Sequence, residues 1–426
     1  MLASEVKTDS KFRAVIRVAA GNFLEMYDFT IFGYYAVAIG QTFFPSGSDF
    51  ISLMRSLMTF GAGYLMRPLG ALVLGSYIDH HGRRKGLLVT LGLMAIGTLS
   101  IALTPGYVAI GLLAPLLVLM GRLVQGLSAG VELGGVAVYL SEIAPPGHKG
   151  AYVCWQSGSQ QVAVMLAALV GITLALTMTP EEVTAWGWRI PMFVGCAIIP
   201  LLFVLRRSLG ETPEFLARTS TPSRADVVRS VGANWQIVIL GMMLSTMTTV
   251  SFYMITAYTP TFGGTTLGLE TVGVNLVILA VAISSFFWLP VMGSVSDRIG
   301  PRPLLIVCSV LTLVTAYPAL QWLVSAPSVT RLLLVELWFS FMYASYNGAM
   351  APYLIGLMPK EARTAGFSIA FSLATAIFGG FTPAICTYLI EVTGNKAIPG
   401  VWLAFAALLG LVATVLTGRR AARPLH

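Results

Sequence analysis

The chain has 426 residues, of which 56% are hydrophobic and only 10% are charged. Soluble proteins carry about 25% charged residues, so a chain with so few cannot give a globule of this size a polar surface. Together with the mean hydropathy of +0.81, this composition excludes a soluble enzyme, a nucleic-acid-binding module and a disordered chain. It predicts an integral membrane protein.

The apolar runs are about 18–28 residues long, which favours membrane-spanning helices over the alternating ten-residue strands of a barrel. Polar segments such as 45–49 and 79–84 separate the runs. The twelve predicted spans are about 14–40, 50–77, 87–105, 108–142, 150–177, 189–207, 235–262, 272–294, 303–324, 331–357, 364–390 and 399–418.

The basic residues predict the orientation, because cytoplasmic loops are rich in Lys and Arg. Most of the 26 Lys and Arg residues fall in the two terminal segments and in alternate loops. We therefore expect a multi-pass protein of the bacterial inner membrane with both termini in the cytoplasm. The net charge of +8 then reflects topology and not a nucleic-acid partner. The four cysteines lie within spans at no metal-ligand or disulfide spacing, and we expect no metal and no cofactor.

The polar stretch around 206–234 divides the chain in the middle. We predict an N-terminal half (1–207), a cytoplasmic linker (208–234) and a C-terminal half (235–426). A motif that follows the second span recurs after the eighth, where Gly75, Asp79, Gly82 and Arg84 are matched by Gly293, Asp297, Gly300 and Arg302. A repeat of this kind indicates that the two halves arose by duplication.

The repeated Gly-x-x-x-Asp-x-x-Gly motif resembles that of the major facilitator superfamily. The resemblance implies an all-α membrane protein with twelve transmembrane helices in two six-helix halves, a monomer that works by alternating access to a midplane site. We expect Asp79 and Arg83 to lock against Glu142 at the cytoplasmic end of helix four; the alternative is that these charges simply mark a cytoplasmic loop. The predicted gating and structural charge network comprises Asp79, Arg83, Arg84, Glu142, Arg67, Asp297 and Arg302.

Further segments resemble the metabolite:proton symporter family, namely 21–29 (GNFLEMYDF), 67–70 (RPLG), 121–126 (GRLVQG) and 186–191 (WGWRIP). Within it, 155–163 and 370–380 are similar to citrate–proton symporters, to which tricarballylate transporters are close relatives. Tyr27, Arg55 and Glu336 depart from that pattern, so the exact tricarboxylate stays open, and we assign Glu336 no role.

Two charged residues are predicted at mid-depth in the N-terminal half. Asp28 lies about 21 Å along the outward-running first span, and Arg122 about 21 Å along the inward-running fourth span. An aspartate beside a guanidinium is held ionised and can release that arginine when it takes up a proton, which is what symport requires. Asp28 is therefore the predicted proton-coupling residue, and a purely structural ion pair is the alternative.

Three more intramembrane charges lie near this pair. Glu25, one helical turn before Asp28, can relay the proton or carry it instead. Arg67 and Glu132 are predicted at similar depths in helices two and four. A structural pair between them is as consistent with the sequence as a role for Glu132 in proton coupling.

Arg122 is the predicted cation for a substrate carboxylate, because guanidinium presents a planar fork of donors. Polar residues recur at helical spacing on several spans and can line an aqueous cavity or join helices. Those predicted to bind substrate with Arg122 are Ser157, Gln160, Gln161, Tyr253 and Asn347. The polar face of span eleven is assigned to packing.

The sequence thus predicts a secondary transporter that imports citrate or a related tricarboxylate such as tricarballylate with protons. Its partners are this small-molecule substrate, protons and the lipid bilayer. A transporter of another organic anion or osmolyte (a dicarboxylate, 2-oxoglutarate or betaine) is the alternative, and a drug exporter a weaker one. We find no P-loop, which argues against ATP drive, and no metal-hydrolase motif, which argues against an enzyme.

Overall fold

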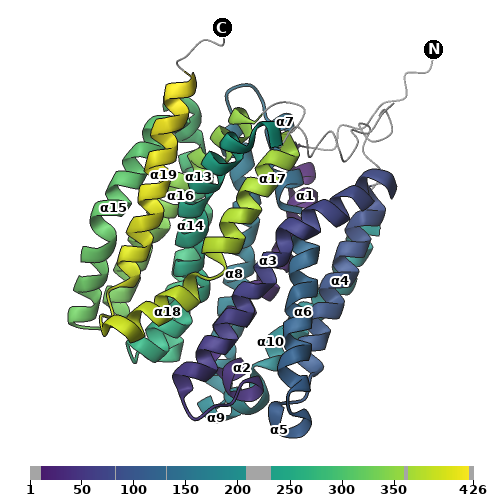
Figure 1. Cartoon of the computed structure of the whole chain (residues 1–426), viewed down its shortest axis with the longest axis vertical. Coiled ribbons are helices and arrows are strands. Elements are labelled where there is room, and N and C mark those ends of the chain that lie inside the picture. The colour runs from purple at the N-terminus through teal and green to yellow at the C-terminus, as the bar shows by residue number, and fades with distance from the viewer. Residues whose placement is uncertain (1–10, 82, 131, 208–231, 359–362, 422–426) are drawn as a thin grey trace.

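The computed structural model describes residues 11–81, 83–130, 132–207, 232–358 and 363–421. Every regular element within these ranges is helical. The helices run along the long axis of the molecule, with those before residue 208 on one side and those after residue 231 on the other (Figure 1). The all-helical fold class predicted from the sequence is confirmed.

The first group of helices covers the first six predicted spans. Its elements are α1 (Lys11–Tyr34), α2 (Ala36–Phe43), α3 (Asp49–His81), α4 (Arg83–Leu103), α5 (Tyr107–Ile110), α6 (Leu113–Ala129), α7 (Glu132–Ile143), α8 (Lys149–Thr177), α9 (Pro180–Glu182), the π-helical segment η1 (Val183–Gly187) and α10 (Arg189–Arg207). The fourth span, predicted as one helix, is made of α5, α6 and α7.

The second group covers the other six spans. Its elements are α13 (Trp235–Tyr253), the π-helical segments η2 (Met254–Tyr258) and η3 (Thr261–Thr266), α14 (Thr271–Ile299), α15 (Pro301–Ser325), α16 (Val329–Leu357), α17 (Arg363–Ala374), the π-helical segment η5 (Thr375–Gly379), α18 (Thr382–Thr393) and α19 (Pro399–Ala421). The seventh and eleventh spans therefore change helix type midway, and π-helical turns are frequent at functional sites.

Local residue chemistry explains where these helices turn. Between α14 and α15, Gly300 adopts a positive φ of 84°, a conformation that glycine reaches without strain. Pro301 follows as the first residue of α15, where its missing N–H leaves no helical hydrogen bond unmade. This tight reversal belongs to the second copy of the repeated motif.

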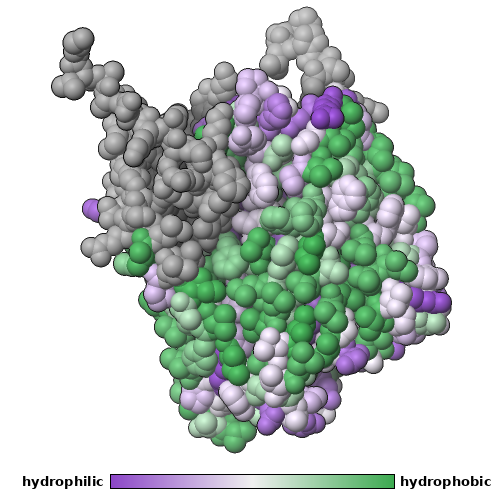
Figure 2. All heavy atoms as spheres, turned by 180° about the vertical axis from the view of Figure 1, so that it is seen from behind, coloured by the Kyte–Doolittle hydropathy of each residue, from purple (hydrophilic) through white to green (hydrophobic). Residues whose placement is uncertain are grey.

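The distribution of side chains is inverted relative to a soluble protein. Leu103, Phe287 and Val314 are each 64% exposed, whereas Arg67 and Arg122 are 2% and 0% exposed. Figure 2 shows hydrophobic side chains spread over the middle of the visible face, with hydrophilic ones gathered toward its ends. An apolar surface around a polar interior is the arrangement that a bilayer requires.

Helix length agrees with this arrangement. Seven of the described helical segments are long and apolar enough to cross a membrane, and the bent pair Pro180–Gly187 and Arg189–Pro200 would make an eighth. Neither α1 nor α16 is among the seven, and both carry acidic residues within their length. Following the predicted orientation, we call the end where α1 begins and α19 ends the inner end, and the opposite end the outer end.

Candidate functional site

The acidic residues of α1 share one face with two aromatic residues. Glu25, Asp28, Phe29 and Phe32 follow the spacing of one helical stripe and are all buried. This stripe meets α3, α4 and α6, which supply the residues that bind it. Buried charges of this kind are costly, so they are usually paired with an opposite charge or belong to a functional site.

Glu25 forms an ion pair with Arg67 of α3. The distance between Glu25 Oε1 and Arg67 Nη2 is 2.6 Å, and the two side chains are 3% and 2% exposed. The Arg67 guanidinium also lies over the rings of Phe29 and Tyr64, at 4.9 and 4.7 Å from their centroids. The side chain of Glu132, predicted as the partner of Arg67, lies outside the described residues, so that pair stays a prediction.

A test of this ion pair follows from its burial. Glu25→Gln leaves the Arg67 charge without its carboxylate, and breaking a buried pair in this way costs about 3–5 kcal/mol of stability. We expect a lower melting temperature in detergent for Glu25→Gln. The double variant Glu25→Gln/Arg67→Met, which has no buried charge at either position, should recover most of the loss. Equal melting temperatures for the single and double variants would contradict a stabilising pair.

Asp28 and Arg122 belong to one chain of hydrogen bonds. Thr98 Oγ1 on α4 donates to Asp28 Oδ2 at 2.5 Å. Gln125 Nε2 donates to Thr98 Oγ1 at 2.9 Å, and Arg122 Nη1 donates to Gln125 Oε1 at 2.8 Å. The chain thus runs from an acid on α1 through α4 to a cation on α6, and all four side chains are buried.

The structure corrects one detail of the sequence prediction. Asp28 was expected directly beside Arg122, but no ion pair joins these two described residues, and Thr98 and Gln125 lie between them. The reason is that Gln125 lies one turn after Arg122 on α6 and fills the space toward α4. Gly97 permits this approach, since a Cβ at that position would lie only 2.6 Å from Gln125 Cγ.

Arg122 is held among aromatic rings instead of beside an acid. Its Cζ lies 4.3, 4.6 and 5.3 Å from the ring centroids of Phe29, Phe32 and Phe60. Apart from Gln125, its one other hydrogen-bond acceptor among the described residues is the Phe60 carbonyl oxygen at 3.4 Å, and Nε has none. A buried guanidinium with free donors is a ready partner for a carboxylate.

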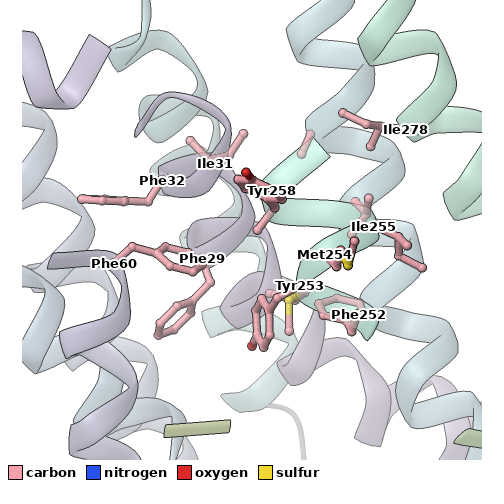
Figure 3. Packing of buried hydrophobic residues seen from close by; sticks show 14 of the residues in the cluster. Phe29, Ile31, Phe32, Phe60, Phe252, Tyr253, Met254, Ile255, Tyr258 and Ile278 are labelled. Atoms are coloured by element: carbon pink, nitrogen blue, oxygen red, sulfur yellow. The ribbon is translucent and has the colours of Figure 1, made fainter. Parts of the chain in front are cut away.

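Tyr253 brings the second group of helices to this site. It is the last residue of α13, and its ring lies 5.1 Å from that of Tyr64 and 6.1 Å from that of Phe60, between centroids. Figure 3 shows Tyr253 and Tyr258 on the side of the seventh span that faces Phe29 and Ile31 of α1. The Phe60 ring also lies 5.3 Å from Arg122 Cζ, so Tyr253 packs on the aromatic residues that surround this guanidinium. One predicted substrate residue from the second half therefore lies beside the predicted cation.

The remaining predicted substrate residues lie on α8 and α16. Asn347 Nδ2 donates to Ser157 Oγ at 2.7 Å, which joins the two groups of helices. Gln161 is fully buried, and neither its amide oxygen nor its amide nitrogen has a hydrogen-bond partner among the described residues. Gln160 instead donates to Asn22 of α1 at 3.4 Å, so it contacts its own half.

Of the predicted charge network, Asp297 has the most informative contacts. Its two carboxylate oxygens accept the backbone N–H groups of Gly150 and Ala151, at 2.7 and 3.0 Å. Those N–H groups belong to the first turn of α8, where a negative charge is favourable. The second copy of the motif therefore joins the two groups of helices at the inner end. Glu142 is exposed, and the side chains of Asp79, Arg83 and Arg84 lie outside the described residues.

The contact between Asp297 and α8 gives a second prediction. Hydrogen bonds to a charged group contribute about 1.5–3 kcal/mol, so we expect the amides of Gly150 and Ala151 to exchange at least about tenfold faster in Asp297→Ala. Hydrogen exchange read by mass spectrometry measures this directly. In Asp297→Asn, which keeps one acceptor, the exchange rates should lie between those of the unaltered protein and of Asp297→Ala. Unchanged exchange in both variants would show that the contact is not formed.

Sequence reasoning missed Thr98, Gln125 and the aromatic residues around Arg122. Gln125 had a usable signal, because it lies one helical turn after Arg122 in the segment that carried the family resemblance. Thr98 had none, since its role depends on how α4 packs against α1.

Arg302, another predicted network residue, lies against Gly418 of α19, where a Cβ would overlap its guanidinium.

Comparison with known proteins gives close relatives. A family model described as "Sugar (and other) transporter" matches residues 14–236. The citrate-proton symporter of Salmonella typhi is 56% identical over 412 residues, covering 97% of this chain and 95% of that protein. The citrate-proton symporter of Klebsiella pneumoniae is 57% identical over 413 residues, covering 97% and 93%.

A solved structure has the same fold. The xylose transporter XylE from E. coli, in a partially occluded inward-open conformation, superimposes with a TM-score of 0.77 over 97% of this chain and 99% of that one. The two sequences are 16% identical, so this likeness concerns the fold alone.

Proposed function

Because the chain belongs to the major facilitator superfamily, in its family of sugar and other transporters, we propose that it imports citrate together with protons. A closely related tricarboxylate such as tricarballylate is the alternative substrate. The proposal rests on the match along nearly the whole length of two citrate-proton symporters and on the chemistry of the buried site.

One observation supports an anionic substrate most directly. Arg122 is fully buried, and within the described part of the chain no carboxylate reaches it. A buried cation with no carboxylate in direct contact is unfavourable, and a substrate carboxylate would relieve it through two parallel N–H···O bonds. The three aromatic rings around the guanidinium hold it in place for that contact.

The proposed coupling uses the chain from Asp28 to Arg122. While Asp28 is ionised, its charge balances that of Arg122 through Thr98 and Gln125. When Asp28 takes a proton from outside, that balance is lost, and Arg122 binds the substrate carboxylate more tightly. Rocking of the halves then exposes the site inward, where loss of substrate and proton restores the first state.

The charge of the substrate explains why protons are needed. Moving one negative charge into a cell with an interior at −100 mV costs about 2.3 kcal/mol, so a tri-anion costs about 7 kcal/mol. Each proton carried along cancels one of these charges. Proton symport therefore allows accumulation of citrate that the membrane potential alone would oppose.

Other residues are proposed to complete the substrate site. Tyr253, whose ring packs on Tyr64 and Phe60, offers a hydroxyl group, and Gln161 offers a buried amide with no partner among the described residues. Ser157 and Asn347 bind each other in this structure, and exchanging that bond for bonds to substrate would couple binding to the approach of the halves. Glu132 remains a proposed member of the proton path.

The proposal includes the setting of the protein. It is a monomeric carrier of the bacterial inner membrane with both termini in the cytoplasm, and it has no cofactor beyond the proton and no enzymatic activity. The halves 1–207 and 235–426, joined by the linker 208–234, are the moving bodies. Relatives that are transporters and the multi-pass helical fold support this setting.

The test is uptake of labelled citrate into vesicles that contain the purified protein. We expect accumulation when the outside is acidic, and its loss on adding an uncoupler. Unlabelled citrate and tricarballylate should compete, whereas betaine should not. Uptake driven by a sodium gradient alone, or competition by betaine in place of tricarboxylates, would reject the proposal.

A further inference from the structure

A second buried acid lies outside the site described above. Glu336 is the seventh residue after the start of α16, so it lies about 10 Å from the outer end of that helix. It is 6% exposed, and its Oε2 has no hydrogen-bond partner in the part of the chain that the structure describes. Its Oε1 lies 2.9 Å from Thr259 Oγ1, which follows η2 in the seventh span.

No cation balances this carboxyl group within the described part of the chain. Arg331, on the same helix, is half-buried and donates to the carbonyl oxygen of Trp322 and to Ser325 Oγ. The charged residues of the neighbouring α14 and α15 are Asp297, Arg298 and Arg302, all at the inner end. An ionised carboxyl group in such surroundings is strongly disfavoured, so a proton is the counter-charge that the site lacks.

The hydrogen bonds of Thr259 indicate where that proton lies. Its hydroxyl oxygen is 2.9 Å from Glu336 Oε1 and also 3.1 Å from the carbonyl oxygen of Met254, which can only accept. The hydroxyl has one hydrogen. When it points at Met254, a protonated Glu336 can donate to the same hydroxyl oxygen; when Glu336 is ionised, the hydrogen is drawn toward the carboxylate and the bond to Met254 weakens.

The direction of the Thr259 hydroxyl hydrogen affects a contact between the two halves. Met254 begins η2, and η2 packs directly on the outer part of α1 (Figure 3). A Cβ at Gly33 would lie 3.0 Å from Ala257 Cβ and 3.2 Å from the Ala257 carbonyl oxygen, so the two backbones touch there.

We infer that Glu336 is a second proton-binding residue, separate from Asp28, whose protonation closes the contact between η2 and α1 at the outer end. In the protonated state Thr259 supports the Met254 carbonyl group, and the contact is closed. In the ionised state the carboxylate takes the Thr259 hydrogen and draws water to itself, and η2 separates from α1. Other ionisable side chains on the elements packed here are Asp28 and Tyr34 on α1, Tyr253 and Tyr258 on the seventh span, Tyr343 on α16, Tyr317 on α15, and Cys386 and Glu391 on α18.

The test reads the contact itself and does not require transport. In a protein with its four cysteines replaced by alanine, Ala257→Cys is labelled from outside with a membrane-impermeant maleimide at several pH values. A cysteine at Val392, which is 64% exposed at the outer end of α18, corrects for the reactivity of the thiol. We expect the labelling rate at position 257, divided by that at position 392, to rise with pH by up to about tenfold per pH unit, as for the titration of one group.

Variants decide whether Glu336 is the titrating group. Glu336→Gln, which stays neutral and can donate to Thr259, should give a low ratio at every pH. Glu391→Gln, an exposed acid on α18, should keep the wild-type rise. If Glu336→Gln fails to fold, Thr259→Val and Thr259→Ser replace it: the first should abolish the rise and the second should keep it. A rise that persists in Glu336→Gln, or in Thr259→Val, would overturn the inference.

The role of this residue in transport rests on the proposed function, but the labelling result does not. Were citrate uptake independent of protons, the pH-dependent contact could still be found, and the proposed function alone would fail. Were the labelling ratio flat in every protein, proton-coupled uptake through Asp28 would stand and the inference about Glu336 would fail.

Discussion

Asp28→Asn is expected to abolish the accumulation of citrate against a gradient while leaving exchange of internal for external citrate intact. Asparagine has nearly the shape of aspartate and keeps an acceptor for Thr98, which donates to Asp28 at 2.5 Å. It cannot take up or release a proton, so the protein is fixed in the state that resembles protonated Asp28. Each coupled proton carries about 2.3 kcal/mol per 100 mV, which is about fiftyfold in the accumulation ratio.

The measurement compares uptake on a proton gradient with counterflow in the same vesicles. Glu25→Gln serves as the comparison, because Glu25 pairs with Arg67 and its loss should lower stability and not coupling. The assignment of the coupling proton to Asp28 would be wrong if Asp28→Asn concentrated citrate as the unaltered protein does. It would also be wrong if Glu25→Gln, once folded, showed the exchange-only behaviour.

Replacement of Arg122 is expected to have the largest effect on substrate binding. Arg122→Gln loses two charge-assisted hydrogen bonds of about 1.5–3 kcal/mol each, which weakens citrate binding by at least about 100-fold. Arg122→Lys keeps the charge but not the planar fork of donors, so its affinity for citrate should lie between those of the unaltered protein and of Arg122→Gln. Citrate binding to the purified protein, measured by calorimetry, gives these values without transport.

The design includes a control for folding. No carboxylate of the described residues contacts Arg122 directly, but Asp28 is linked to it through Thr98 and Gln125, so the melting temperature of each variant is measured beside its affinity. Arg55→Gln, at an exposed position on α3, should leave affinity unchanged. Citrate binding by Arg122→Gln at an affinity within a few-fold of the original would place the anion site elsewhere.

Much of the fold could be predicted from hydropathy because each span must be apolar for its full length. The same reasoning failed where a span changes helix type. The transitions at Met254 and Thr375 occur inside apolar sequence, with the nearest proline, Pro260, six residues after Met254. They depend on contacts with other helices, such as that between Ala257 and Gly33, which a single sequence does not encode locally.

The candidate site was predictable to the extent that depth follows from residue number. Counting residues along the first and fourth spans put Asp28 and Arg122 at similar depth, and the structure joins them in one hydrogen-bonded chain. Depth does not give rotation about the helix axis or the identity of neighbours. For that reason Thr98 on α4 and the pairing of Arg67 with Glu25 could be found only from coordinates.

The role of Glu336, by contrast, could not be predicted from its position along the span. The sequence marked it as a charge inside a span but gave no partner, because Thr259 and Met254 come from a helix about 80 residues earlier in the chain. The hydrogen bond between Ser157 and Asn347 is similar, since it joins residues 190 positions apart. In both cases the residue types were informative, and their meaning depended on how the two halves face each other.

The central claim is that a proton on Asp28 and a substrate carboxylate on Arg122 bind as linked events. Calorimetry of citrate binding in buffers with different ionisation enthalpies counts the protons taken up per citrate bound. We predict proton uptake by the unaltered protein near neutral pH, and about one proton fewer for Asp28→Asn, whose site already resembles the protonated state. Equal proton uptake by the two proteins would contradict the claim.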